Sequence, residues 1–200
     1  MAADAAQRLQ AVADRVTPVA TDLCLQVPTT ARCDFAILLD DRPGQPPNAF
    51  QTLDPRGRPV LLFTAALVGQ TRNDDELAFA FGHEAAHHIA GHIPAAQDLA
   101  QAGAALAGAL AGLGGADAGR IRLAQDLGAT LAARSFSRDF ELEADALGAR
   151  IAWAAGYDPL RGAAYFTRIP DPGDLFLGAH PPNAQRIETV RRAIATLPPA

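Results

Sequence analysis

The sequence of 200 residues contains no lysine, only two cysteines and no excess of basic charge. Its 17 basic residues are all arginine and are outnumbered by 22 acidic residues, which leaves a net charge of -5 at pH 7. Proteins that bind nucleic acid need a basic face for the phosphates. The charge therefore excludes nucleic acid as an expected partner, and we interpret the missing lysine as a trace of genomic base composition.

The first residues also lack the pattern of a secretory signal peptide, which is a basic start followed by an uninterrupted apolar run. Residues 1–17 instead carry Ala6, Leu9, Ala13 and Val16 at helical spacing, with charged residues between them. This pattern predicts a surface helix. It leaves two expectations open: a cytoplasmic protein, or a periplasmic or secreted one whose leader is absent from this chain.

The two cysteines, Cys24 and Cys33, lie close enough for residues 27–30 to form the turn of a small disulfide loop. A disulfide would indicate an oxidising compartment. Two buried free thiols are the alternative, because free cysteine is often buried. We therefore expect a bacterial periplasmic or secreted protein, with a cytoplasmic one left open.

Length and composition, with 49% hydrophobic and 20% charged residues, predict one domain over residues 1–200. Strand-type runs occur at Phe35–Leu39, Asn48–Leu53 and Val60–Thr64, and a proline and glycine turn at 54–57 joins the last two into a hairpin. The expected fold class is α+β: a mostly helical, zincin-like domain with a small antiparallel sheet of about three strands.

The remaining segments read as helices. A short one is expected at Ala65–Gln70, and the main one begins at Asn73, with Glu76 completing a capping box. Residues 95–119 carry no charge between Asp98 and Asp117 and would nearly span a bilayer. Alanine and glycine contribute little transfer free energy, so a helical hairpin is favoured over membrane insertion. Residues 121–155 predict a long helix, with a break near Gly128 or Ser135.

Four of the five histidines lie between residues 80 and 92. His83 and His87 are four residues apart, which places both imidazoles on one face of a helix. Glu84 lies on the adjacent flank, where it can reach a water bound to a shared metal ion. This HExxH arrangement is typical of two zinc ligands and a general base. The motif can also occur by chance, but the surrounding apolar residues predict a buried helix, in which these groups need partners.

A catalytic zinc ion takes three protein ligands and a water. Glu141 is the best third candidate, and Asp145, four residues on, can accept the free ring N–H of a ligating histidine. A metzincin would need glycine at 90 and histidine at 93, where this chain has alanine and isoleucine. His88 and His92 lie off the shared helical face, so they are expected to be dispensable for the metal.

Four blocks resemble the HtpX/BepA-like zinc metallopeptidases, which include the CAAX prenyl endopeptidases. They are Asn48-Ala49-Phe50, the segment from Gly82 to His92, the segment from Ser137 to Pro159, and His180-Pro181-Pro182 with Arg186. The resemblance implies one zinc on His83, His87 and Glu141, Glu84 as base and Asp145 supporting His83. It also implies that His180 can occupy the fourth zinc position as a latch, and that Arg186 faces the site, where it is a candidate for stabilising the oxyanion.

The expected function is zinc-dependent endopeptidase cleavage of unfolded or damaged proteins, bound in extended form. Substrate is expected to add as a strand along an apolar edge formed by Val60, Leu61, Leu62, Phe63 and Thr64, beside Asn48. The alternatives are a zinc-stabilised, chaperone-like peptide-binding module and an amidase acting on cell-wall peptides. Peripheral membrane association is a further expectation, and the sequence does not indicate an oligomeric state.

Overall fold

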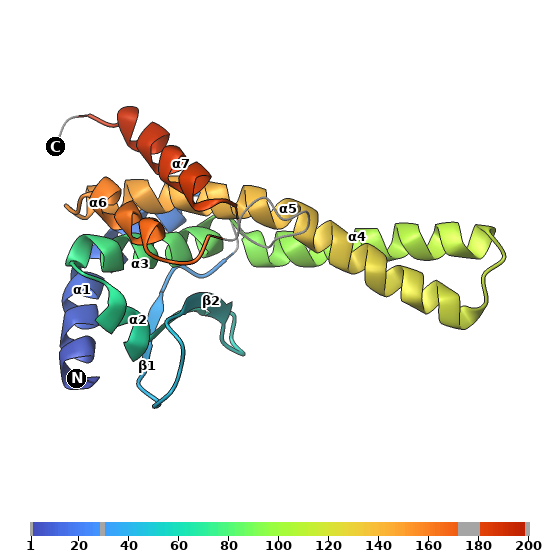
Figure 1. Ribbon diagram of the computed structural model, residues 1–200, viewed down its shortest axis with the longest axis horizontal. Coiled ribbons are helices and arrows are strands. Elements are labelled where there is room, and N and C mark those ends of the chain that lie inside the picture. The colour runs from blue at the N-terminus through green and yellow to red at the C-terminus, as the bar shows by residue number, and fades with distance from the viewer. Residues whose placement is uncertain (1, 29–30, 172–180, 199–200) are drawn as a thin grey trace.

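The computed structural model describes residues 2–28, 31–171 and 181–198 (Figure 1). In chain order its elements are α1 (Ala2–Gln26), β1 (Ala36–Asp40), β2 (Ala49–Leu53), β3 (Pro59–Thr64), α2 (Ala65–Gln70), α3 (Asp74–Ile89), α4 (His92–Leu113), α5 (Ala118–Ala154), α6 (Pro159–Ala163), the 3-10 helix η1 (Ala164–Thr167) and α7 (Asn183–Ala195). The fold is mostly helical α+β, as the sequence predicts.

The sheet has the order β1-β3-β2. The hairpin of β2 and β3 is antiparallel, and its turn closes through a hydrogen bond from the Gly57 N–H to the Asp54 carbonyl, which confirms that prediction. The expectation of an all-antiparallel sheet is wrong, because β1 pairs parallel to β3. The sheet is therefore mixed.

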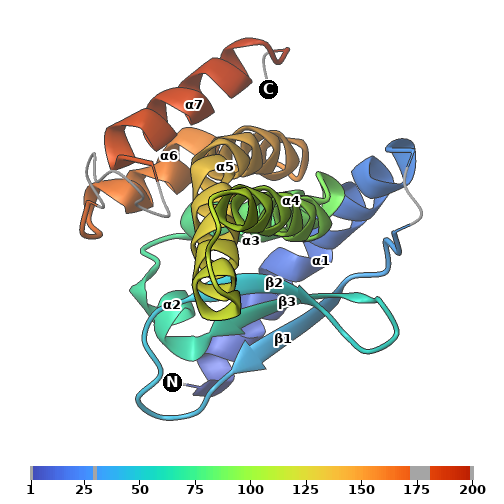
Figure 2. The same ribbon diagram turned by 90° about the vertical axis from the view of Figure 1, so that its right-hand side faces the viewer.

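β3 is the central strand, so the prediction that residues Val60–Thr64 offer an edge is also wrong. Nearly every position of β3 is buried, and a continuous apolar run is typical of a strand with neighbours on both sides. The edge that lies nearest α3 and α4 is β2, as Figure 2 shows.

The main core lies between α1, α3 and the sheet. α1 buries one stripe, formed by Leu9, Val12, Val16 and Ala20, against α3. The helix predicted over residues 1–17 extends to Gln26 and passes through Pro18, because the buried stripe continues to Cys24 beyond the proline.

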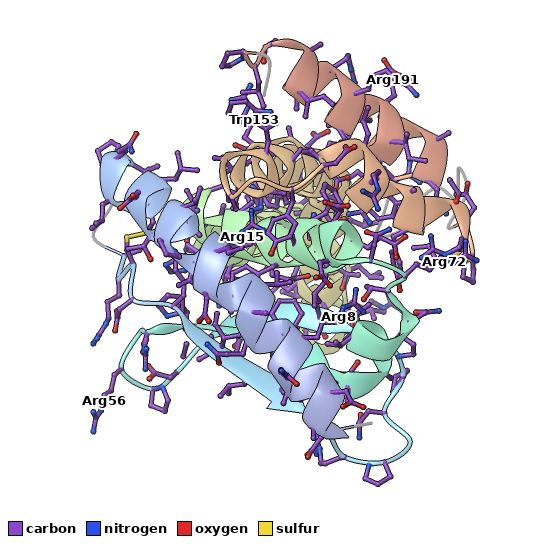
Figure 3. All side chains as sticks on the ribbon, turned by 90° about the vertical axis from the view of Figure 1, so that its left-hand side faces the viewer. Arg8, Arg15, Arg56, Arg72, Trp153 and Arg191 are labelled. Carbon is purple, nitrogen blue, oxygen red and sulfur yellow. A yellow bond between two sulfur atoms is a disulfide. The ribbon has the colours of Figure 1, made fainter. Side chains whose placement is uncertain are left out.

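Cys24 and Cys33 form a disulfide, which ties the end of α1 to the segment before β1 (Figure 3). Two residues of the predicted intervening turn, Thr29 and Thr30, lie outside the described residues. The two thiols are therefore paired, and the alternative of two free buried thiols is not what the structure contains.

Two glycines set the distance between α3 and α5. A Cβ atom on Gly82 would lie 2.6 Å from the carbonyl oxygen of Gly148, and one on Gly148 would lie 2.6 Å from the backbone nitrogen of His83. Side chains on either glycine would push the helices apart, since real Cβ atoms do not come that close. This backbone contact lets short side chains from α3 and α5 meet.

α4 and α5 form the predicted hairpin, which projects from the body of the molecule (Figure 1). The chain turns at Gly115 in the left-handed conformation, with φ of 76°. α5 is continuous through Gly128 and Ser135, so no break occurs there. Among the described residues, no helix combines the length and the hydrophobicity that a membrane span requires. Peripheral membrane association stays a prediction.

Candidate metal centre

α3 carries the first two candidate ligands and begins as the sequence predicts. The Asn73 side chain caps the helix by accepting a hydrogen bond from the Glu76 N–H at 3.0 Å. The Glu76 carboxylate reaches back to the Arg72 N–H, one residue before the cap, and pairs with Arg168. One end of α3 is thereby held in place, and the first histidine follows two turns later.

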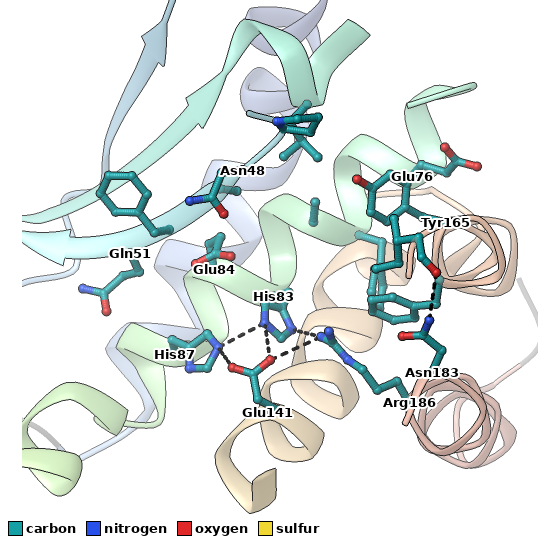
Figure 4. A pocket seen from close by; sticks show the side chains of 18 of the residues that line it. Asn48, Gln51, Glu76, His83, Glu84, His87, Glu141, Tyr165, Asn183 and Arg186 are labelled. Carbon is teal, nitrogen blue, oxygen red and sulfur yellow. Dashed lines mark hydrogen bonds and ion pairs between the residues drawn. The ribbon is translucent and has the colours of Figure 1, made fainter. Parts of the chain in front are cut away.

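His83 and His87 face each other one turn apart on α3, with their Nε2 atoms 3.0 Å apart. Glu141 reaches the same point from α5. Its Oε1 lies 3.3 Å from Nε2 of His87, and its Oε2 lies 3.6 Å from Nε2 of His83. Figure 4 shows the three side chains converging. The structure thus brings together the three residues proposed as ligands.

These three residues offer ligand atoms within 4.8 Å of one another, and no other such group of three occurs among the described residues. Two imidazoles and one carboxylate form a donor set that suits zinc and leaves a fourth position for water or substrate. The residues present therefore fit a catalytic zinc ion.

Asp145 lies one turn after Glu141 on α5, fully buried, with Oδ1 2.9 Å from Nδ1 of His83. Arg186 of α7 donates two hydrogen bonds of 2.7 Å to this carboxylate, one from Nε and one from Nη2. Burial raises the pKa of Asp145, but the hydrogen bonds from Arg186 and His83 outweigh burial and hold it below its ordinary value. The carboxylate stays ionised and accepts the Nδ1–H of His83, which leaves Nε2 free for a metal.

Arg186 is buried, packs over the ring of Phe166 at 4.0 Å, and brings Nη2 to 3.5 Å from Glu141 Oε2. Because Nε and Nη2 of Arg186 both donate to Asp145, the geometry supports a role for Arg186 in positioning Asp145. Its role as a stabiliser of the oxyanion stays a prediction.

Glu84 points from α3 toward β2, on the other side of His83 from Glu141 (Figure 4). Burial raises the pKa of Glu84 above its ordinary value. The charges of His83 and His87 and a backbone hydrogen bond with Gln51 oppose this rise without cancelling it. Glu84 thus lies beside the candidate ligands but outside the group that they form, where a carboxylate can act as a general base.

A cavity of about 860 Å³ opens over these groups. One wall is formed by Phe50 and Gln51 of β2 with Asn48, the residue before the strand, and another by Tyr165 and Phe166 of η1. Asn48 lines the cavity, whereas none of Val60, Leu61, Leu62, Phe63 and Thr64 does. No sequence pattern pointed to the second wall, because its residues form no motif and reach the site only through the packing of α6 on α3.

The other histidines have different surroundings. His88 is buried on another side of α3, with Nε2 2.6 Å from the Arg32 carbonyl oxygen. His92 was expected off the helical face that His83 and His87 share, yet its Nδ1 lies 2.9 Å from Nδ1 of His87. The expectation assumed one continuous helix, but α3 ends at Ile89 and Gly91 turns the chain in the left-handed conformation. His180 lies outside the described residues.

Two histidines on one helix and a carboxylate from a second helix form a donor set typical of a zinc metallopeptidase. The family model described as Peptidase family M48 matches residues 6–194, almost the whole chain. The protein belongs to peptidase family M48, which uses zinc, and this is consistent with the resemblance to the HtpX/BepA-like enzymes. No curated protein matches the chain significantly.

Proposed function

We propose that the protein is a zinc-dependent endopeptidase that hydrolyses peptide bonds of unfolded or damaged proteins. The observation that carries this proposal is the convergence of His83, His87 and Glu141 beside Glu84, on the floor of an open cavity. His83, His87 and Glu141 would hold the ion, which supplies Lewis acidity and lowers the pKa of a bound water. Glu84 accepts a proton from the attacking water and passes it to the leaving amine.

The outer edge of β2 offers backbone groups with which an extended substrate could pair. The Thr64 N–H donates to the Asn48 carbonyl at 2.9 Å, and hydrogen-bonded pairs alternate along an antiparallel ladder. The register Ala49↔Phe63 and Leu53↔Pro59 therefore turns the N–H and C=O groups of Ala49 and Leu53 away from β3. We propose that substrate adds as a strand to this edge of β2, in place of the edge expected at β3.

Replacing Ala49 by proline tests this edge. Proline removes the N–H that would pair with substrate, and it is tolerated at the first residue of a strand. One lost hydrogen bond costs roughly 0.5–1.5 kcal/mol. Adding the clash of the ring with the incoming strand, we expect kcat/KM for casein peptides to fall about 10-fold or more.

Ala49→Val is the matched control, because valine has similar bulk and keeps the N–H. It should cleave at nearly the wild-type rate, and both variants should bind zinc like the wild type. Equal kcat/KM for the proline and valine variants would exclude pairing at Ala49.

A peptide-binding module without efficient cleavage is the alternative function. It would use the same cavity and the same β2 edge, so binding alone does not separate the two. The endopeptidase is favoured by the position of Glu84 beside the candidate ligands, because a purely structural zinc site needs no base. We also propose, on the resemblance alone, that His180 keeps the enzyme latent by taking the fourth ligand position.

The disulfide supports a periplasmic or secreted location, since such bonds persist in oxidising compartments. We expect the intact protein from an oxidising compartment to weigh two hydrogens less than its reduced form, and to resist alkylation at Cys24 and Cys33 until it is reduced. Mass spectrometry before and after reduction measures both properties. Two thiols that alkylate without reduction would contradict this location.

A further inference from the structure

His92 occupies an unusual place beside the candidate ligands. It is buried, and its ring stacks on that of Phe140 with centroids 4.5 Å apart. Its Nδ1 lies 2.9 Å from Nδ1 of His87, and its Nε2 lies 3.3 Å from Oε2 of Glu143. His87, His92 and Glu143 therefore form a continuous polar chain that leads from the metal position toward solvent, where the Glu143 side chain is 63% exposed.

The direction of the hydrogen bonds in this chain follows from the chemistry of imidazole. A neutral ring has one N–H and one lone pair, so only one of two facing Nδ1 atoms can donate. If His92 donated, the proton of His87 would sit on Nε2 and block the lone pair that faces Glu141 and His83. If His87 donates from Nδ1, its Nε2 is free for metal, and His92 donates from Nε2 to Glu143.

We propose that His92, backed by Glu143, is a positioning residue that holds His87 in the tautomer and orientation that bind metal. This inference rests on the proposed zinc site and adds to it the support of the second histidine. His83 is positioned in the same way by Asp145, an ionised carboxylate that accepts hydrogen bonds from Arg186. The left-handed conformation of Gly91 explains the position of His92. Gly91 separates α3 from α4, and His92, the first residue of α4, faces back toward His87.

Two variants of nearly equal shape separate the hydrogen bond from packing. His92→Asn keeps an acceptor oxygen close to the place of Nδ1, whereas His92→Leu keeps the bulk beside Phe140 and offers no acceptor. Zinc dissociation constants are measured for each by competition with a chelator of known affinity. We expect His92→Leu to bind zinc about 10–100-fold more weakly than the wild type, and His92→Asn to recover most of that loss.

A spectroscopic measurement on the metal-free protein tests the tautomer directly. Long-range proton–nitrogen correlation spectra distinguish a protonated Nδ1 from a protonated Nε2, at a pH where the imidazoles are neutral. His87 should carry its proton on Nδ1 in the wild type and in His92→Asn. In His92→Leu it should shift toward the Nε2 tautomer.

Glu143 and His88 provide the controls. Glu143→Ala should weaken zinc binding less than His92→Leu, because water can replace an exposed carboxylate, and the double variant should be no worse than His92→Leu alone. His88→Ala removes a buried histidine of α3 that faces the Arg32 carbonyl, and it should bind zinc like the wild type.

The outcomes separate this inference from the zinc site itself. A wild-type protein that binds no zinc would overturn the proposed function. A wild type that binds zinc, with equal affinities and an unchanged His87 tautomer in both His92 variants, would overturn only the role of His92. A loss in His92→Leu that asparagine does not recover and that His88→Ala equals would indicate general destabilisation, and would also overturn it.

Discussion

Glu84→Gln is expected to abolish cleavage of an unfolded protein such as casein while leaving zinc bound. Glutamine keeps the size of the side chain and its helix propensity, but it cannot accept a proton. Positioned acid–base groups contribute roughly 10²–10⁴-fold to rate, so the residual activity should be at least about 100-fold lower. Zinc should be retained because Glu84 is not a member of the group formed by His83, His87 and Glu141.

The matched control is Glu188→Gln on α7, where the carboxylate pairs with Arg191 at the surface. It makes the same chemical change away from the cavity and should not affect the cleavage rate. The comparison is repeated in a His180→Ala background, because a latched enzyme would be slow for a reason unrelated to Glu84. His180→Ala should raise proteolysis, and adding Glu84→Gln should return it to background. If His180→Ala and Glu84→Gln were equally inactive over several unfolded substrates, the peptide-binding module would be the better account.

Glu141→Gln is expected to remove most of the zinc. Its carboxylate is the sole anionic member of the ligand group, and its oxygens approach both histidines. A neutral amide is a poorer ligand for zinc, which binds carboxylate oxygen, thiolate and imidazole. Loss of partners beyond the ligands already costs about 10–100-fold in affinity, so we expect losing a ligand to cost more than about 100-fold.

Metal analysis after dialysis against a weak chelator measures this loss. Asp139→Asn, an exposed acidic position on the same helix, is the control and should retain a full equivalent of zinc. Full zinc occupancy in Glu141→Gln would remove Glu141 from the ligand set, and the third ligand would have to be sought elsewhere.

Local sequence spacing predicted the parts of the site that depend on helix geometry alone. His83 and His87 share a face because they are one turn apart, and the same holds for Glu141 and Asp145. The start of α3 at Asn73 and the hairpin of α4 and α5 were likewise predictable, because capping residues and glycine-rich turns act locally. That the two pairs meet depends on the close contact of Gly82 with Gly148, which no spacing reveals.

The features that the sequence did not reveal are set by tertiary pairing. The parallel pairing of β1 with β3 turned an expected edge into a central strand and left β2 facing the cavity. A left-handed conformation at one residue, Gly91, redirected His92 from an outer face to the side of His87. The contact of Arg186 with Asp145 joins α7 to α5 across 41 positions of sequence, and only the family resemblance had suggested that this arginine faces the site.

The most direct test of the central claim is an anomalous difference map at the zinc absorption edge, from crystals of the zinc-loaded protein. The proposed site predicts one peak per chain, within about 2.0–2.2 Å of Nε2 of His83, Nε2 of His87 and a carboxylate oxygen of Glu141. Glu84 should lie beside the peak without touching it. A peak bound instead by His92 and Glu143, or none near His83 in protein that holds a full equivalent of zinc, would contradict the account.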